Sequence, residues 1–173
     1  IADANTSLIE AFGKAVDVLY NATRGISDLI TVHGLINLDF ADVKTTMQNG
    51  GTALMGAATS SGENRAERAA IEAISSPLLD GLSLAGATNV LGNITPGRPL
   101  GIREATAPTS IIQREAGEDV EVIFGTVIDE SMADELRVTV IATGFDKTKS
   151  ELEEAGVRRT VALKVIKPGM DSR

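Results

Sequence analysis

Two carboxylates three residues apart, Asp39 and Asp42, stand at the predicted start of a short helix. Residues three apart on a helix share a face, so both carboxylates would point toward the loop before the helix. Asn37 adds an amide two residues before Asp39. An amide and two carboxylates at an exposed helix end can orient a water molecule or hold a cation beside a phosphate. These three residues are therefore the candidate catalytic group.

A structural interpretation explains the same pair without catalysis. Aspartate is a favoured N-cap residue, and an acid in the first turn interacts favourably with the helix dipole. The chain would then be a structural module that docks a partner. A third interpretation is a self-contained hydrolase, although carboxylates three residues apart on one helix leave little room for a substrate between them. The acid pair alone leaves these interpretations open.

A second stretch, residues 92–98 (GNITPGR), imitates the phosphate-binding pattern G-x-x-x-x-G-K-[ST]. Arg98 stands where the pattern needs lysine, and Pro99 replaces the hydroxyl residue. Pro96 also lacks the backbone N–H that a phosphate cradle could use. The stretch is therefore predicted to be a turn at the exit of a strand.

Hydrophobic spacing predicts the elements that position the acids. Ser7 and Glu10 have capping-box spacing, and apolar residues then recur three and four apart through Leu29, which predicts a helix of roughly 24 residues. A loop at 31–38 and a short helix from Asp39 follow. Strands are expected at 52–58, 88–94, 120–127 and 136–142, and helices at 63–75 and from a first-turn proline at 108 to residue 117.

This order of elements predicts an α/β (α+β) two-layer sandwich, one sheet with helices on it, after a long first helix. We divide the chain into the long helix (1–31), the loop and short helix (32–50), the sandwich (51–145) and a tail (146–173). The tail is expected to be either an extra edge strand or a flexible linker, because 161, 163 and 165 alternate as apolar residues.

Composition excludes several classes of protein. The net charge of −8 disfavours nucleic acid and anionic membranes as partners, since both attract cationic surfaces. Cysteine is absent, so no disulfide or cysteine-based zinc site exists. No apolar run approaches the roughly 20 residues of a membrane span. The chain begins with Ile1 rather than Met, which we interpret as the start of a fragment or a processed product.

Residues 37–43, NLDFADV, resemble the activation loop of FtsZ, the bacterial tubulin-like division GTPase, and match its N-x-D-F-A-D pattern. Further stretches fit the same family in order: 25–30 (GISDLI), 61–66 (SGENRA), 73–79 (AISSPLL), 93–95 (NIT) and 135–145 (ELRVTVIATGF). The resemblance covers about residues 7–145. It implies the tubulin/FtsZ C-terminal-domain fold with its central helix, without the N-terminal domain whose GGGTGTG-type loop holds GTP.

In that family subunits stack head to tail, and the activation loop of one subunit completes the GTP site of the next. The resemblance implies that Asp39 and Asp42 are the catalytic acids and that Asn37 helps to hold them. Phe12 and Asp17 match central-helix positions that face the guanine base, as part of a nucleotide site. GTP, with Mg²⁺, is the implied substrate of the full-length polymer, and this chain alone is expected to be inactive.

The implied partners are other FtsZ subunits, with division-site regulators and membrane tethers as further candidates for the full-length protein. The implied location is the cytoplasm at the division site, in the septal ring. No metal site of the chain's own, no nucleic acid and no membrane insertion are expected. A non-catalytic assembly module remains the alternative function.

Overall fold

The computed structural model describes residues 5–32, 34, 36, 38–48, 50–75 and 84–145. Within these residues the strands form one four-stranded sheet, in the order β1-β4-β2-β3. Strands β2 and β3 run parallel, and the other neighbours are antiparallel. The elements along the chain are α1 (Leu8–Thr31), α2 (Phe40–Met47), β1 (Leu54–Ser61), α3 (Arg65–Ile74), β2 (Asn89–Pro96), α4 (Ile102–Ala116), β3 (Glu121–Thr126), the 3₁₀ helix η2 (Glu130–Met132) and β4 (Glu135–Thr143).

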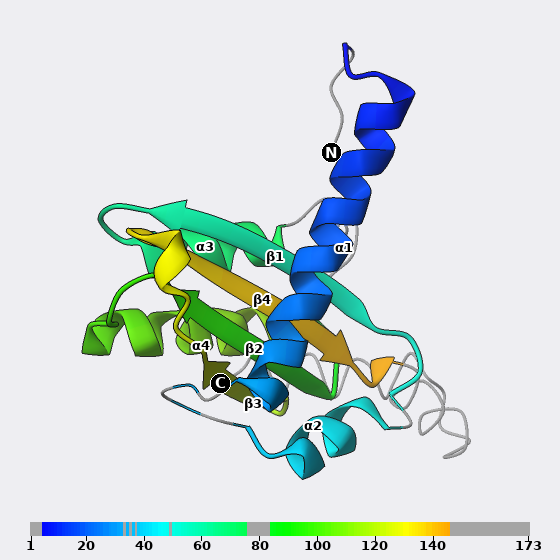
Figure 1. Ribbon diagram of the computed structural model, residues 1–173. Helices are drawn as coiled ribbons and strands as arrows, with labels where there is room; N and C mark the ends of the chain where they lie inside the picture. Colours follow the sequence, from blue (N-terminus) through cyan, green and yellow to red (C-terminus); the bar gives the residue numbers. More distant parts are fainter. Residues whose placement is uncertain are drawn as a thin grey trace.

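The long helix α1 begins where the sequence predicts. The Ser7 hydroxyl accepts a hydrogen bond from the Glu10 backbone N–H, and the Glu10 carboxylate accepts one from the Ser7 N–H. Only the second half of α1 is buried within the described structure, through Ala22, Gly25, Ile26 and Leu29. Its first half extends beyond the edge of the sheet (Figure 1). The helix is therefore anchored at its C-terminal half.

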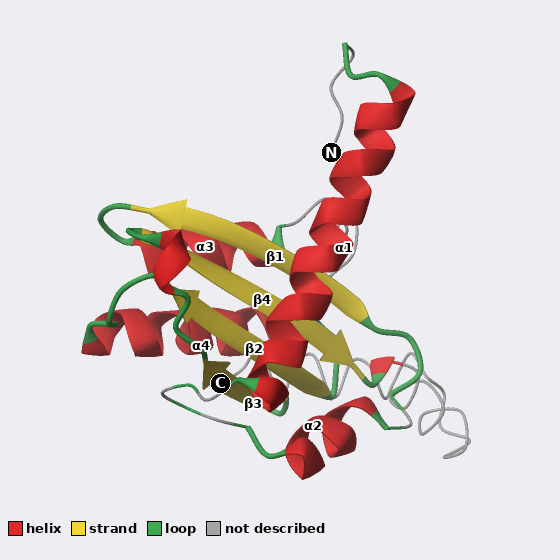
Figure 2. Ribbon diagram, viewed as in Figure 1, coloured by secondary structure: helices red, strands yellow, loops and turns green. Residues whose placement is uncertain are grey.

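Helices α3 and α4 cover the face of the sheet opposite α1 (Figure 2). Helix α3 packs on the sheet through four alanines, each at most 1% exposed: Ala66, Ala69, Ala70 and Ala73. The spacing of three and four places them on one face, and their small side chains let the helix lie close to the strands. The predicted sandwich is thus confirmed, with α1 added on its second face.

Strand β4 lies between β1 and β2 and contributes side chains to two hydrophobic cores, one on each face of the sheet. Its residues alternate between the two faces of the sheet. Val138 and Val140 belong to the core under α3 and α4. Ile141 belongs to the second core, under α1, with Leu29 and Val43. The strand is buried on both faces from Val138 to Thr143, as expected for a strand in the middle of a covered sheet.

Two sequence-based expectations differ from the structure. Pro108 lies inside α4 rather than in its first turn, since the helix already begins at Ile102. The start depends on Glu104, whose carboxylate accepts a hydrogen bond from the Gly101 N–H at 3.0 Å. Strand β2 continues to Pro96, so most of the phosphate-loop imitation is strand, and the predicted turn begins later. The tail at 146–173 lies outside the described residues.

Candidate functional site

Asp39 ends the loop after α1 and caps α2. Its Oδ1 accepts a hydrogen bond from the Ala41 N–H at 3.2 Å, and its carbonyl accepts from the N–H groups of Asp42 and Val43. Asp42 lies in the first turn, and both acidic residues are exposed. The predicted helix start is confirmed. Asn37, the third member of the group, lies outside the described residues, so its role stays a prediction.

Helix α2 is held at both ends. Before the helix, Ile36 forms an antiparallel bridge with Thr126 at the end of β3: the Thr126 N–H donates to the Ile36 carbonyl at 2.9 Å, and the Ile36 N–H donates to the Thr126 carbonyl at 3.4 Å. Near its end, the Thr143 hydroxyl donates to the Thr46 carbonyl at 2.9 Å. Val43 is buried between these points. The acids therefore stand on a short helix with a defined position.

An ion-pair cluster joins the anchored half of α1 to the loop after β3. Arg24 lies 3.6 Å from Asp28 and 3.9 Å from Asp129. Hydrogen bonding from Ser131 is the main cause that lowers the pKa of Asp129 below its usual value, and the positive charges of Arg24 and Arg137 add to it. Asp129 is thus an anion at neutral pH and attracts Arg24. The cluster helps to fix α1 on the sheet.

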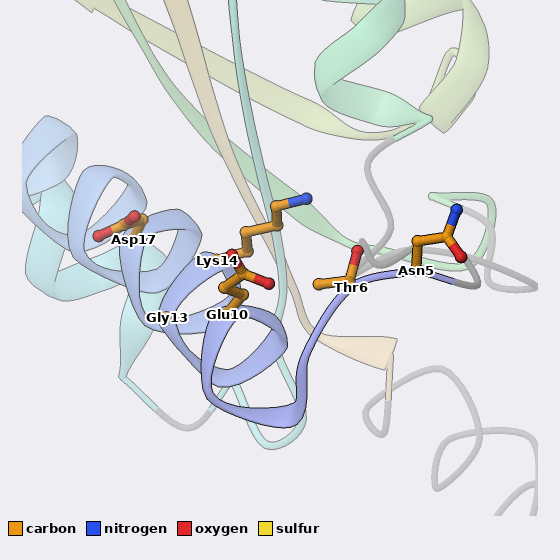
Figure 3. A pocket seen from close by; sticks show the side chains of 6 residues that line it. All are labelled: Asn5, Thr6, Glu10, Gly13, Lys14 and Asp17. Atoms are coloured by element: carbon orange, nitrogen blue, oxygen red, sulfur yellow. The ribbon is translucent and has the colours of Figure 1, made fainter.

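Phe12 and Asp17 lie at the free half of α1, far from Asp39. Phe12 is 65% exposed, and Asp17 is exposed as well. Asp17 lines a hollow of about 360 Å³ together with Asn5, Thr6, Glu10, Gly13 and Lys14 (Figure 3). Phe12 is not part of this lining. The two residues thus remain exposed, and no ligand role follows from their geometry alone.

The structure keeps the two predicted groups apart. The 24 residues of α1 give it a length of about 36 Å. Phe12 and Asp17 are near one end, whereas the loop to Asp39 follows the other end (Figure 1). A single copy of this chain therefore does not bring the acids next to Asp17.

Sequence analysis missed a polar contact beneath α1. The Asn93 side-chain N–H donates to the Gly25 carbonyl, although Asn93 is fully buried in β2. Its register partner on β4 is Thr139, which is also fully buried. The available signal was an asparagine inside a predicted apolar strand, because buried polar side chains need hydrogen-bond partners. This hydrogen bond holds α1 close to strand β2 at Gly25.

No group of three or more His, Asp or Glu side chains in the described part of the chain is placed to hold a metal ion. None of the helices described has the length and hydropathy needed to cross a membrane.

Comparison with known proteins finds similarity in both sequence and structure. The profile described as "FtsZ family, C-terminal domain" matches residues 51–146. An empty FtsZ dimer from M. jannaschii has 40% sequence identity to this chain and a TM-score of 0.75, over 82% of this chain and 41% of that one.

More distant structures share the fold. The GDP-bound CetZ1 monomer of Haloferax volcanii is 16% identical, with a TM-score of 0.64 over 82% of this chain and 42% of its own. A TubZ protofilament in the GTPγS form, from Bacillus thuringiensis serovar israelensis, is 11% identical, with a TM-score of 0.55 over 77% of this chain and 38% of its own. The chain thus spans about two fifths of the length of these proteins.

Proposed function

Because the chain belongs to the FtsZ family, we propose that it is the C-terminal half of a filament-forming cell-division GTPase. In this proposal its activation loop completes the GTP site of the adjacent subunit in a head-to-tail polymer. The protein would act in the cytoplasm, in the septal ring at the division site.

The proposed chemistry is hydrolysis of the γ-phosphate of GTP by water. Catalysis of phosphoryl transfer is mainly positioning and electrostatic stabilisation, so a carboxylate that orients the attacking water has a direct role. Asp39 and Asp42 take this role, and Asn37 helps to hold them. Mg²⁺ enters with the nucleotide, since this ion is usually held by one or two carboxylates together with substrate phosphates.

One observation carries the proposal: the exposed acids and the exposed Asp17 region lie at opposite ends of α1. A head-to-tail contact is heterologous and joins two different faces of successive subunits. Acids at one end and nucleotide contacts at the other meet only between two subunits. Phe12 and Asp17 would then contact the base from their own subunit, while Asp39 and Asp42 reach the nucleotide of the neighbour.

The alternative, a non-catalytic assembly module, also has a specific observation in its favour. Asp39 accepts the Ala41 N–H as a helix cap, and capping alone would explain its presence. The two functions differ in what they require of the side chain. Capping needs an oxygen that accepts a hydrogen bond, whereas water activation needs the negative charge.

Asparagine separates these requirements, because it caps helices about as well as aspartate but carries no charge. In a full-length protein that contains this chain, we expect Asp39→Asn and Asp42→Asn each to lower GTP hydrolysis by about 10²-fold or more. Nucleotide affinity should stay at the parental level, since the loss is of transition-state stabilisation. The measurements are phosphate release per assembled subunit and equilibrium binding of GTP.

The matched control is Glu67→Gln, which removes an exposed first-turn acid from α3. Its hydrolysis rate should equal that of the parent. If Asp39→Asn and Asp42→Asn also hydrolyse GTP at the parental rate, Asp39 is a cap only and the assembly module is the correct function.

A further inference from the structure

Two glycines lie where the loop before Asp39 meets the outer strand of the sheet. Strand β3 is the last in the order β1-β4-β2-β3, so β2 uses only one of its edges. At its other edge, Thr126 exchanges two backbone hydrogen bonds with Ile36 of the loop. Gly34 precedes Ile36 by two residues, and Gly125 precedes Thr126 directly. Each glycine thus flanks the bridge from one side.

Gly34 is required for space. A Cβ atom on Gly34 would lie 2.0 Å from the Thr126 carbonyl oxygen and 3.1 Å from the Val127 Cα, both of which are backbone atoms. A side chain here would therefore force the loop away from β3.

Gly125 leaves space for the same loop from the side of the strand. Its added Cβ would lie 3.1 Å from the Ile36 carbonyl oxygen and 3.2 Å from the Leu38 Cγ. It would also lie 2.4 Å from a terminal carbon of Leu29, which is buried in the core under α1. The contact with the Ile36 carbonyl is to backbone, so a change of side-chain rotamer does not relieve it.

We propose that Gly34 and Gly125 are positioning residues, which let the loop bridge to β3 and thereby set the position of Asp39. The inference rests on the proposed function, since it concerns the placement of the acids there assigned. Asp39 follows Ile36 by three residues, so at most about 10–11 Å of chain separates it from the bridge. Val43 is buried and the Thr46 carbonyl accepts a hydrogen bond from Thr143, so the later part of α2 is held in place. A shift of the loop would therefore move the segment between Ile36 and Val43, which contains Asp39.

The bridge itself can be measured on this chain without any GTPase activity. Gly34→Ala should raise the hydrogen-exchange rate of the Thr126 amide by about tenfold or more, because its acceptor, the Ile36 carbonyl, moves away. Gly125→Ala should do the same from the strand. The matched control is Gly101→Ala, where the nearest atom to an added Cβ is a Glu104 carboxylate oxygen at 3.7 Å, an ordinary van der Waals contact. Unchanged exchange in Gly34→Ala would overturn the inference.

The functional consequence is measured in the full-length protein. A misplacement of about 1 Å costs about 10²-fold in rate, so Gly34→Ala should lower phosphate release per assembled subunit by about that factor. GTP affinity and the unfolding midpoint should stay near the parental values, a pattern that general loss of structure would not give. Rates are taken in filaments of the variant alone and are normalised to the amount of polymer, so that weaker self-assembly does not hide the readout.

The two hypotheses fail in different ways. Parental hydrolysis in Asp39→Asn contradicts the proposed function. Loss of hydrolysis in Asp39→Asn together with a parental rate in Gly34→Ala contradicts the positioning role alone. A rate loss in Gly101→Ala equal to that in Gly34→Ala also contradicts it, since the effect would then not depend on the bridge.

Discussion

The guanidinium of Arg65 and the carboxylate of Glu104 form a two-pronged ion pair, with Nε 2.7 Å from Oε1 and Nη2 3.2 Å from Oε2. Arg65 is fully buried, and its Nη1 also donates to the Asp134 carbonyl at 3.0 Å. The pair joins the first residue of α3, the first turn of α4 and the chain entering β4. It therefore fixes three elements of the sandwich at one corner.

We expect Glu104→Ala to lower the free energy of unfolding by about 3–5 kcal/mol, because it leaves a buried guanidinium without its counter-charge. The matched control is Glu115→Ala, which breaks the exposed pair with Arg114 at 3.9 Å. That change should cost at most about 1 kcal/mol. Urea unfolding of both variants decides the matter. Equal losses would show that the Arg65 pair contributes no more than a surface contact.

The same carboxylate makes stability depend on pH. The hydrogen bond from Arg65 is the largest cause that lowers the pKa of Glu104 below its ordinary value of 4.5. Because the folded pKa lies below the unfolded one, the stabilisation is complete above about pH 4.5 and is lost as pH falls through the folded pKa. Glu104→Gln cannot lose this contribution on acidification. As the pH is lowered from 5, its unfolding free energy should fall less steeply than that of the parent. Parallel curves would refute the role of Glu104 in this pH dependence.

Local patterns predicted the elements near the site well. Ser7 and Glu10 marked the start of α1, and Asp39 marked the start of α2, because capping involves residues at most three apart. The helix expected at 63–75 was also found, as α3 (Arg65–Ile74). Such signals lie within one turn of helix, so a single sequence displays them.

Contacts between distant residues were not predicted. Ile36 and Thr126 are 90 positions apart, and nothing in either segment marks their bridge. Pro108 was misplaced because proline usually stands in the first turn of a helix, whereas here it lies buried inside α4. The types and the spacing of the two acids could be read from the sequence. The anchoring of the loop before them could not, because it depends on a strand that lies far away in the chain.

Gly25 offers a direct test of how closely α1 approaches the sheet. A Cβ atom on Gly25 would lie 2.5 Å from the Thr139 hydroxyl oxygen and 3.0 Å from the Thr139 Cβ. Gly25→Ala should therefore lower the unfolding free energy by about 1–3 kcal/mol, although alanine favours helix. Gly13→Ala is the control on the same helix, since an added Cβ there meets nothing within 4 Å. It should stabilise by about 0.5–1 kcal/mol, and a gain from both substitutions would contradict the close contact.

The last prediction concerns filaments, and it depends on the proposed function. A growing head-to-tail filament needs both faces on every subunit. This chain has the face with Asp39 and Asp42, but its 173 residues hold no GGGTGTG-type phosphate loop for the other face. We therefore expect the chain to dock on the exposed GTP site of a terminal subunit and to stop growth there. Stoichiometric addition should reduce light scattering by a full-length protein assembling with GTP.

A competing cause of inhibition is the uncovered apolar stripe on the free half of α1. Its large exposed side chains are Leu8, Ile9, Phe12, Val16, Leu19 and Tyr20. Such a stripe favours self-association, which could trap full-length subunits without any docking at their GTP sites. Asp42→Trp keeps the stripe and the Asp39 cap but places a bulky ring on the docking face. This variant should self-associate as the parent chain does and yet leave assembly nearly unchanged. Inhibition by both chains to the same extent would assign the effect to the stripe and refute end capping, as would full assembly in the presence of the parent chain.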